Sequence, residues 1–304
     1  MRPSKTGITG IYPMLYAFFD EHDSLDRDAT TQQVNALADC GVHGLAVLGV
    51  ATESNKMTLK ERRILLEWVA QDLSKRLPLS VTVAEPSIAG QIEFVRAAQA
   101  VDATWVILQP PPVRGVSEAE LIRFFGAVAD KAEIPVGLQI APEYLGVDMS
   151  YGALAELARQ HANVALLKME ITPLDAARLV DETDGMFDVF NGRAGQEMTD
   201  ALRAGCVGII PGGESADVLA RIYELLKQDT SEAKIEADRQ YRDIAPLVTF
   251  LEGSMDTLLI YGKRIAARRF GLGPERARAR APCASATEFG LSLAERLSTE
   301  LKPL

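Results

Sequence analysis

The stretch Val164-Ala165-Leu166-Leu167-Lys168 is an apolar run that ends in a lysine. A run that is apolar throughout, without alternation, is typical of a strand buried on both faces of a parallel sheet. Seven more runs that are short, apolar and rich in β-forming residues occur along the chain. In chain order, the eight runs are residues 10–19, 44–50, 79–84, 105–109, 136–140, 164–168, 187–190 and 208–210.

The segments between these runs show the periodicity of amphipathic helices. Examples are residues 59–73, 88–101, 118–131 and 154–161. Eight strands that alternate with helices predict a closed (β/α)₈ TIM barrel of the α/β class. The alternative is an open doubly wound sheet, but such a sheet is expected to carry a glycine-rich phosphate turn after its first strand, and this sequence has none there.

The chain after Gly213 contains helical patterns only, at residues 216–227, 232–250, 254–270 and 288–301. The first of these completes the eighth strand–helix unit. We therefore predict a barrel over residues 1–228 and a C-terminal helical extension over residues 229–304. The extension is expected to pack on the barrel within one structural unit, without folding separately.

The net charge of the chain argues against polyanionic partners. The net charge of −10 opposes binding to nucleic acid and to anionic membranes. A basic run near the C-terminus is predicted to lie on a solvated helix with an interface or loop role. It comprises Lys263, Arg264, Arg268, Arg269, Arg276, Arg278 and Arg280.

The cysteines and histidines give no sign of a metal site. Cys40, Cys206 and Cys283 are far apart and lack C-x-x-C spacing, which favours a reducing cytoplasm. The three histidines have no ligand spacing, so we expect neither a metal nor a cofactor. The longest uncharged stretch, residues 6–19, is shorter than the ~20 apolar residues of a membrane helix, so no membrane association is expected.

Lys168 is the main candidate for chemistry because active sites of β/α barrels lie at the C-terminal ends of the strands. Desolvation at that position favours the neutral amine that a Schiff-base nucleophile requires. The alternative is a strand-end lysine that reaches solvent or pairs with a carboxylate.

Further motifs occur in order along the chain. They are Gly44-Leu-Ala-Val-Leu-Gly-Val-Ala-Thr-Glu-Ser54 with Leu59-Lys-Glu-Arg62, Pro135-Val-Gly-Leu-Gln-Ile-Ala-Pro142 with Gly146-Val-Asp148, and Leu167-Lys168. Together they resemble the dihydrodipicolinate synthase / N-acetylneuraminate lyase family over nearly the whole chain. The resemblance implies a (β/α)₈ class I lyase, assembled as a homotetramer or homodimer. It also implies that Lys168 forms an imine with pyruvate or another small 2-keto acid.

Several positions depart from the dihydrodipicolinate synthase pattern. The motif Gly-Thr-Thr-Gly-Glu is here Gly49-Val50-Ala51-Thr52-Glu53, the fourth-strand Tyr-Tyr pair is Pro111-Pro112, the fifth-strand tyrosine is Gln139, and the arginine after it is Tyr144. These changes remove the hydroxyls of the family's proton relay and the arginine that binds the second substrate. Gln139 and Lys168-Met169-Glu170 instead resemble the 2-keto-3-deoxy sugar-acid dehydratase branch, although Ile140 stands where that branch has Asp.

The candidate site combines this resemblance with strand geometry. Side chains alternate along a strand, so Lys168 and Glu170 share one face. The candidate catalytic residues are Lys168, Glu170 and Gln139. Glu170 is either the acid/base or a salt-bridged residue at the barrel rim, and Gln139 is either a pocket residue or a core amide.

The expected substrate-binding residues follow the strand ends. We predict that the chain approaches a ligand closely at Gly192, and that Arg193 binds a sugar-acid oxygen unless it is an exposed surface residue. The full set is Gly49, Val50, Ala51, Thr52, Tyr144, Gly192, Arg193 and Ile210.

The sequence therefore predicts a Schiff-base lyase, a dehydratase or an aldolase, that acts on pyruvate or a small 2-keto-3-deoxy acid. One alternative is 4-hydroxy-tetrahydrodipicolinate synthase itself. Another is a non-catalytic 2-keto-acid-binding barrel, which the missing relay hydroxyls favour and the retained Lys168 argues against.

Overall fold

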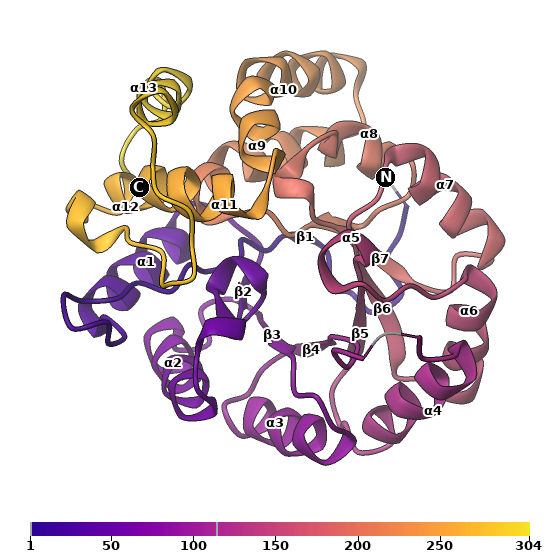
Figure 1. The fold of residues 1–304 in the computed structure, drawn as a ribbon. Helices are drawn as coiled ribbons and strands as arrows, with labels where there is room; N and C mark the ends of the chain where they lie inside the picture. Colours follow the sequence, from indigo (N-terminus) through magenta and orange to yellow (C-terminus); the bar gives the residue numbers. More distant parts are fainter. Residues whose placement is uncertain (1, 114) are drawn as a thin grey trace.

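The computed structural model describes residues 2–113 and 115–304. At its centre is a sheet of eight strands in the order β1-β8-β7-β6-β5-β4-β3-β2, with every neighbouring pair parallel. The strands are β1 (Gly10–Ile11), β2 (Leu45–Val47), β3 (Leu79–Val83), β4 (Trp105–Leu108), β5 (Val136–Ile140), β6 (Val164–Met169), β7 (Asp188–Asn191) and β8 (Gly208–Ile209). Helices surround this sheet (Figure 1).

The segment after β1 joins the two ends of the sheet. Met14 forms parallel bridges with Ala46 and Gly212. The Leu15 N–H donates to the Ala46 carbonyl (2.8 Å), and the Ala46 N–H donates to the Pro13 carbonyl (3.0 Å). These bonds link the β1 segment to β2, and the predicted (β/α)₈ barrel is confirmed.

The first predicted strand is too long. The expected run covered residues 10–19, whereas β1 ends at Ile11. Pro13 has no backbone N–H and cannot donate to a neighbouring strand at that position. Beyond it, the chain pairs only through single bridges.

Most of the barrel helices begin at a side-chain cap. Thr58 starts α2 with a capping box: its hydroxyl accepts from the Glu61 N–H, and the Glu61 carboxylate accepts from the Thr58 N–H. The helices are α1 (Arg27–Asp39), α2 (Leu59–Leu73), α3 (Ile88–Ala100), α4 (Glu118–Ala129), α5 (Pro142–Leu145), α6 (Tyr151–Gln160), α7 (Pro173–Glu182), α8 (Met198–Arg203) and α9 (Ala216–Lys227).

Aromatic side chains fill part of the barrel interior. Tyr12, Trp105 and Phe190 are buried and pack together, with ring centroids 5.3 to 6.1 Å apart. Side-chain layers of this kind make a TIM barrel a packed core instead of a pore. A ligand site is therefore expected at the ends of the strands.

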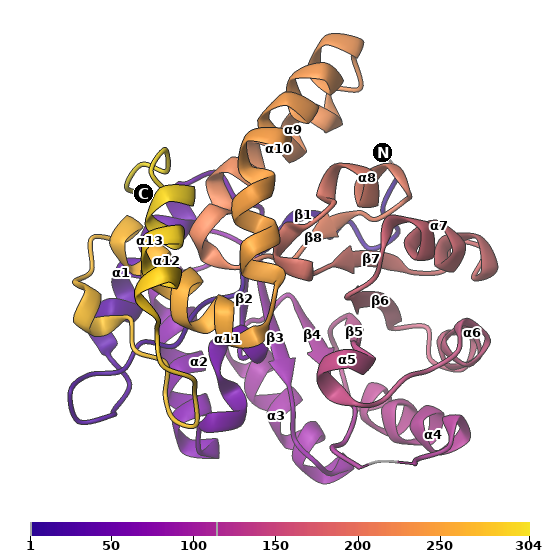
Figure 2. The ribbon, with the colours of Figure 1, turned by 45° about the horizontal axis from the view of Figure 1, so that its top comes forward.

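The C-terminal extension consists of α10 (Ser231–Glu252), α11 (Met255–Thr257), the π-helix η5 (Leu258–Gly262), α12 (Lys263–Arg269), and α13 (Glu288–Leu297). Helix α10 contacts α9, and α12 contacts the turn η4 (Gly213–Ser215). Figures 1 and 2 place α11 to α13 beside the barrel near α1, and Figure 2 shows that the α9–α10 junction projects beyond it. The helical segment expected over residues 254–270 is present as Met255–Arg269, which runs without a break and includes the π-turn η5.

In the described part of the chain, no helix taken singly has the length and apolar composition needed to cross a membrane. One bent pair, Ser231–Glu252 with Met255–Arg269, meets those two criteria only when its parts are combined across a 113° bend.

Candidate active site

Strand β6 brings Lys168 and Glu170 to the carboxyl end of the barrel. The Lys168 Nζ donates to Glu170 Oε1 at 2.8 Å, and both side chains are largely buried. In the sheet register, Lys168 lies between Gln139 on β5 and Phe190 on β7. A buried ion pair needs further hydrogen bonds to offset the loss of hydration.

The segment after β7 supplies one of those bonds. The Arg193 backbone N–H donates to Glu170 Oε2, so both carboxylate oxygens are engaged. A Cβ at Gly192 would overlap the Glu170 carboxylate. The close approach predicted at Gly192 is therefore to Glu170, because the glycine leaves the space that this carboxylate occupies.

A pocket surrounds this pair at the strand ends. It is lined by Met14, Val50, Ala51, Gln139, Tyr144, Lys168, Glu170, Arg193, Ala194, Ile210, Pro211, Gly212, Glu252, Met255 and Leu258. All three residues expected to be catalytic line it, as do five of the eight expected substrate-binding residues. The exceptions are Gly49, Thr52 and Gly192.

Gly49 and Thr52 hold the wall of the pocket instead of lining it. The Thr52 hydroxyl donates to the Leu15 carbonyl (2.6 Å) and is fully buried, and the Gly49 N–H contacts Met14 Sδ (3.3 Å). Residues Val50–Thr52 form the short 3₁₀-helix η1, in which successive side chains point about 120° apart. Thr52 consequently turns away from the pocket that Val50 and Ala51 line.

Gln139 lines the pocket with its amide already oriented. Its Oε1 accepts from Gln109 Nε2 (2.9 Å), and Gln139 is 1% exposed. Gln91 in turn donates to the Gln109 carbonyl (2.8 Å). Because an amide does not titrate near neutral pH, Gln139 can position a ligand but cannot act as an acid or base.

Arg193 is not a free surface residue. Its guanidinium pairs with Glu197 (2.6 Å) and donates to Gln196 (2.8 Å), and its Nε lies 3.7 Å from Glu252 Oε1. These partners hold the side chain beside the pocket, and its charge is shared between two carboxylates.

The pocket also contains a second carboxylate that the sequence did not indicate. Glu252 ends α10, and its Oε1 lies 3.4 Å from the Tyr144 hydroxyl. Burial, together with the nearby Glu170 carboxylate, raises the pKa of Glu252 to about 7. No strand end carries this residue. Only the packing of the extension brings Glu252, Met255 and Leu258 to the pocket.

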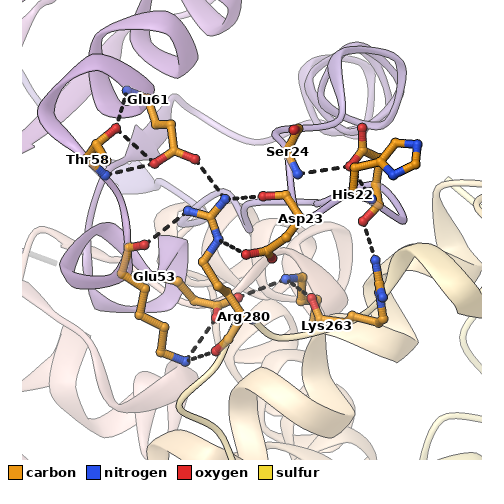
Figure 3. Close-up of polar contacts among 11 residues, drawn as sticks. His22, Asp23, Ser24, Glu53, Thr58, Glu61, Lys263 and Arg280 are labelled. Atoms are coloured by element: carbon orange, nitrogen blue, oxygen red, sulfur yellow. Dashed lines mark hydrogen bonds and ion pairs between the residues drawn. The ribbon is translucent and has the colours of Figure 1, made fainter.

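Glu53 connects the extension to the second-strand turn (Figure 3). It follows η1 directly and is fully buried. Its Oε1 accepts from Lys263 Nζ (2.8 Å), and its Oε2 accepts from Lys56 Nζ (3.0 Å) and the Arg280 N–H (2.9 Å). The turn that carries Val50 and Ala51 is thereby held by the C-terminal segment.

The prediction of a solvated basic helix is wrong for two of its members. Lys263 is 0% exposed and Arg269 is 2% exposed. Arg269 donates to the Glu214 carbonyl and to the Asp217 carboxylate, both at 2.8 Å. Each charge is buried because a carboxylate from the barrel pairs with it.

The fold and site together define a β/α-barrel enzyme with a lysine–carboxylate pair at the end of its sixth strand. The chain belongs to the dihydrodipicolinate synthetase family, whose model matches residues 7–293. It is thus a lyase of that family, and the resemblance inferred from the sequence is confirmed.

Relatives within the family differ in reaction. L-2-keto-3-deoxyarabonate dehydratase of Azospirillum brasilense is 28% identical over 248 residues, covering 79% of this chain and 78% of the relative. 4-hydroxy-tetrahydrodipicolinate synthase of Stenotrophomonas maltophilia (strain K279a) is 29% identical over 209 residues, covering 68% of this chain and 70% of the relative. Both a dehydratase and a synthase are therefore among the similar proteins.

Solved structures agree with the fold. YagE from Escherichia coli K12, determined in complex with pyruvate, superimposes with a TM-score of 0.85 at 22% identity and covers 98% of this chain and 100% of its own. In sequence, the alignment with YagE spans 55% of each chain.

Proposed function

We propose that Lys168 forms an imine with a small 2-keto acid and that the protein is a 2-keto-3-deoxy sugar-acid dehydratase or aldolase. The observation that carries the proposal is the Lys168–Glu170 contact of 2.8 Å inside a pocket at the strand ends. An amine that attacks a carbonyl must first lose its proton, and a carboxylate in contact with it is a suitable acceptor.

The proposed chemistry begins at the substrate carbonyl. The neutral Lys168 amine adds to C2, water leaves, and a protonated imine results. The positive imine nitrogen makes the C3 protons acidic. In a dehydratase, a base removes a C3 proton and the C4 hydroxyl leaves as water after it gains a proton. Glu170 is the group we assign to these transfers, with Gln139 orienting the substrate.

Four replacements favour this chemistry over that of the synthase. Val50 and Pro112 have no hydroxyl, and Gln139 does not titrate, so none of them can pass protons. Tyr144 provides no positive charge for the carboxylate of a second substrate. The similarity to the dehydratase of Azospirillum brasilense across 79% of this chain also supports the proposal.

Borohydride reduction tests the imine. The protein is treated with pyruvate and sodium borohydride, digested, and mapped by mass spectrometry. We expect a stable pyruvate-derived adduct on the peptide that contains Lys168 and no such adduct in Lys168→Met. Absence of an adduct with every 2-keto acid tried, or an adduct that persists in Lys168→Met, would contradict the proposal.

The reaction itself is tested with a panel of 2-keto-3-deoxy acids of five and six carbons. A dehydratase yields a product lighter by one water, whereas an aldolase yields pyruvate and an aldehyde. We expect one of these two products from at least one acid, and none from Lys168→Met.

We further propose a homotetramer or homodimer located in the cytoplasm. The support is the family membership together with three cysteines that are all free. Burial raises the pKa of the Cys206 thiol to about 12, which keeps it in the unreactive thiol form. Sedimentation velocity of the purified protein measures the assembly.

A further inference from the structure

Glu252 is a carboxylate that the proposed reaction does not use, although it lines the same pocket. Its side chain is 19% exposed, and it stands at the last residue of α10, outside the barrel strands. The Lys168 amine contacts Glu170, whereas the neighbours of Glu252 are the Tyr144 hydroxyl at 3.4 Å and Arg193 Nε at 3.7 Å. Within the pocket, Glu252 therefore contacts a different set of side chains from Lys168.

Arg193 lies between the two carboxylates of the pocket. Its backbone N–H binds Glu170, while its side chain faces Glu252 and Glu197. Among the described residues that line the pocket, the cations are Lys168 and Arg193, and each is already paired with a carboxylate. A ligand with a second carboxylate would find no unpaired positive charge there.

We propose that Glu252 is a specificity-determining residue, which accepts hydrogen bonds from hydroxyl groups at the distal end of the substrate and excludes substrates that carry a second carboxylate there. This inference rests on the proposed function, because it takes the pocket to bind a 2-keto acid with C2 beside residue 168 and the distal carbons toward Glu252. Two like charges in a partly buried pocket repel strongly, whereas a hydroxyl donates to a carboxylate in a charge-assisted hydrogen bond.

The selection depends on pH. Glu252 faces Glu170 at the end of β6, Arg193 in η3 (Arg193–Gly195), and Glu143 and Tyr144 in α5. Since the pKa of Glu252 is raised to about 7, its charge is present above neutral pH and is lost below it. Discrimination against a second carboxylate is thus expected to increase as the pH rises through neutrality.

The test compares two substrates of equal length, a 2-keto-3-deoxy aldonic acid and the 2-keto-3-deoxy aldaric acid that has a carboxylate at its far end. We expect Glu252→Gln to shift the ratio of their kcat/KM values toward the aldaric acid by about tenfold or more. Glu143→Gln is the matched control, because it removes a carboxylate close to Glu252 that neither lines the pocket nor pairs with Arg193. It should leave the ratio unchanged.

A binding measurement tests the role of Glu252 without requiring turnover. The affinities of both acids are measured by calorimetry in Lys168→Met protein, with and without Glu252→Gln. A preference that shifts toward the aldaric acid supports the role of Glu252 even where no imine forms, and failure of borohydride trapping then counts only against the proposed function. An unchanged preference in Glu252→Gln, an equal shift in Glu143→Gln, or binding of neither acid would overturn the inference.

Discussion

Lys263 and Glu53 form an ion pair of 2.8 Å in which both side chains are fully buried. They are 210 positions apart in the chain. The Lys263 Nζ also donates to the Arg278 carbonyl (2.6 Å) and lies 5.0 Å from the centroid of the Phe19 ring. This pair fixes the C-terminal extension to the turn that carries Val50 and Ala51, so the wall of the pocket depends on both parts of the chain.

Removal of one partner of this pair should be costly. We expect Lys263→Met to lower the free energy of unfolding by ~3–5 kcal/mol, because Glu53 would lose a buried cationic partner. The double variant Glu53→Gln/Lys263→Met should be more stable than Lys263→Met. Urea unfolding followed by circular dichroism measures both values. A loss below about 1 kcal/mol in the single variant would show that Lys56 and the Arg280 N–H suffice for Glu53.

A shortened chain tests the predicted boundary at residue 228. A protein limited to residues 1–228 lacks Lys263, Arg269 and the pocket residues of the extension, and it leaves Glu53 with fewer partners. We expect it to lack a cooperative thermal transition, in contrast to the full chain. A cooperative transition in the shortened protein would instead identify the barrel as an independently folding domain.

Glu170→Gln separates imine formation from proton transfer. The variant should still trap a 2-keto acid on Lys168, yet lose dehydration or cleavage by ~10²-fold or more if the carboxylate transfers protons. Trapping and turnover are measured on the same preparation. Turnover close to that of the unmodified protein would instead make Glu170 a structural residue that pairs with Lys168.

The protein should be a poor 4-hydroxy-tetrahydrodipicolinate synthase. Loss of positioned acid/base groups typically lowers a rate by ~10²–10⁴-fold, and the positions of Val50, Pro112 and Gln139 carry no such group. Turnover of pyruvate with aspartate semialdehyde is measured beside a genuine synthase. Comparable rates would refute the prediction and identify this chain as a synthase.

Glu214 should make stability depend on pH. It is fully buried behind the pocket, its Oε2 accepts from the Tyr16 hydroxyl (2.7 Å), and burial raises its pKa. The native protein then binds this proton more tightly than the unfolded chain does, so the contribution of Glu214 to stability decreases as the pH rises from the unfolded pKa through the folded one. Relative to Glu214→Gln, the unmodified protein should lose stability over that interval. The free energies of unfolding of both proteins are measured by urea unfolding across this pH interval. A difference between them that does not vary with pH would contradict the prediction.

The sequence alone was sufficient to predict the barrel and the Lys168–Glu170 pair at the carboxyl end of its sixth strand. An uninterrupted apolar run indicates a strand that is buried on both faces, and such a run can be recognised from neighbouring residues in the sequence. The Lys168–Glu170 contact is also local, because residues two apart in a strand share a face. The predicted ends of the strands were less accurate, as at Pro13. Where a strand ends depends on whether the adjacent strand offers a hydrogen-bond partner at that position.

The tertiary structure decided the rest of the site. Glu252 reaches the pocket through the packing of α10, and Lys263 is buried because Glu53 meets it from a distant segment. Thr52 belongs to the expected binding motif, yet the turn of η1 directs its hydroxyl to the Leu15 carbonyl. In each case the chemical role depends on a partner that lies far away in the chain, and neither residue type nor local spacing specifies where such a partner lies.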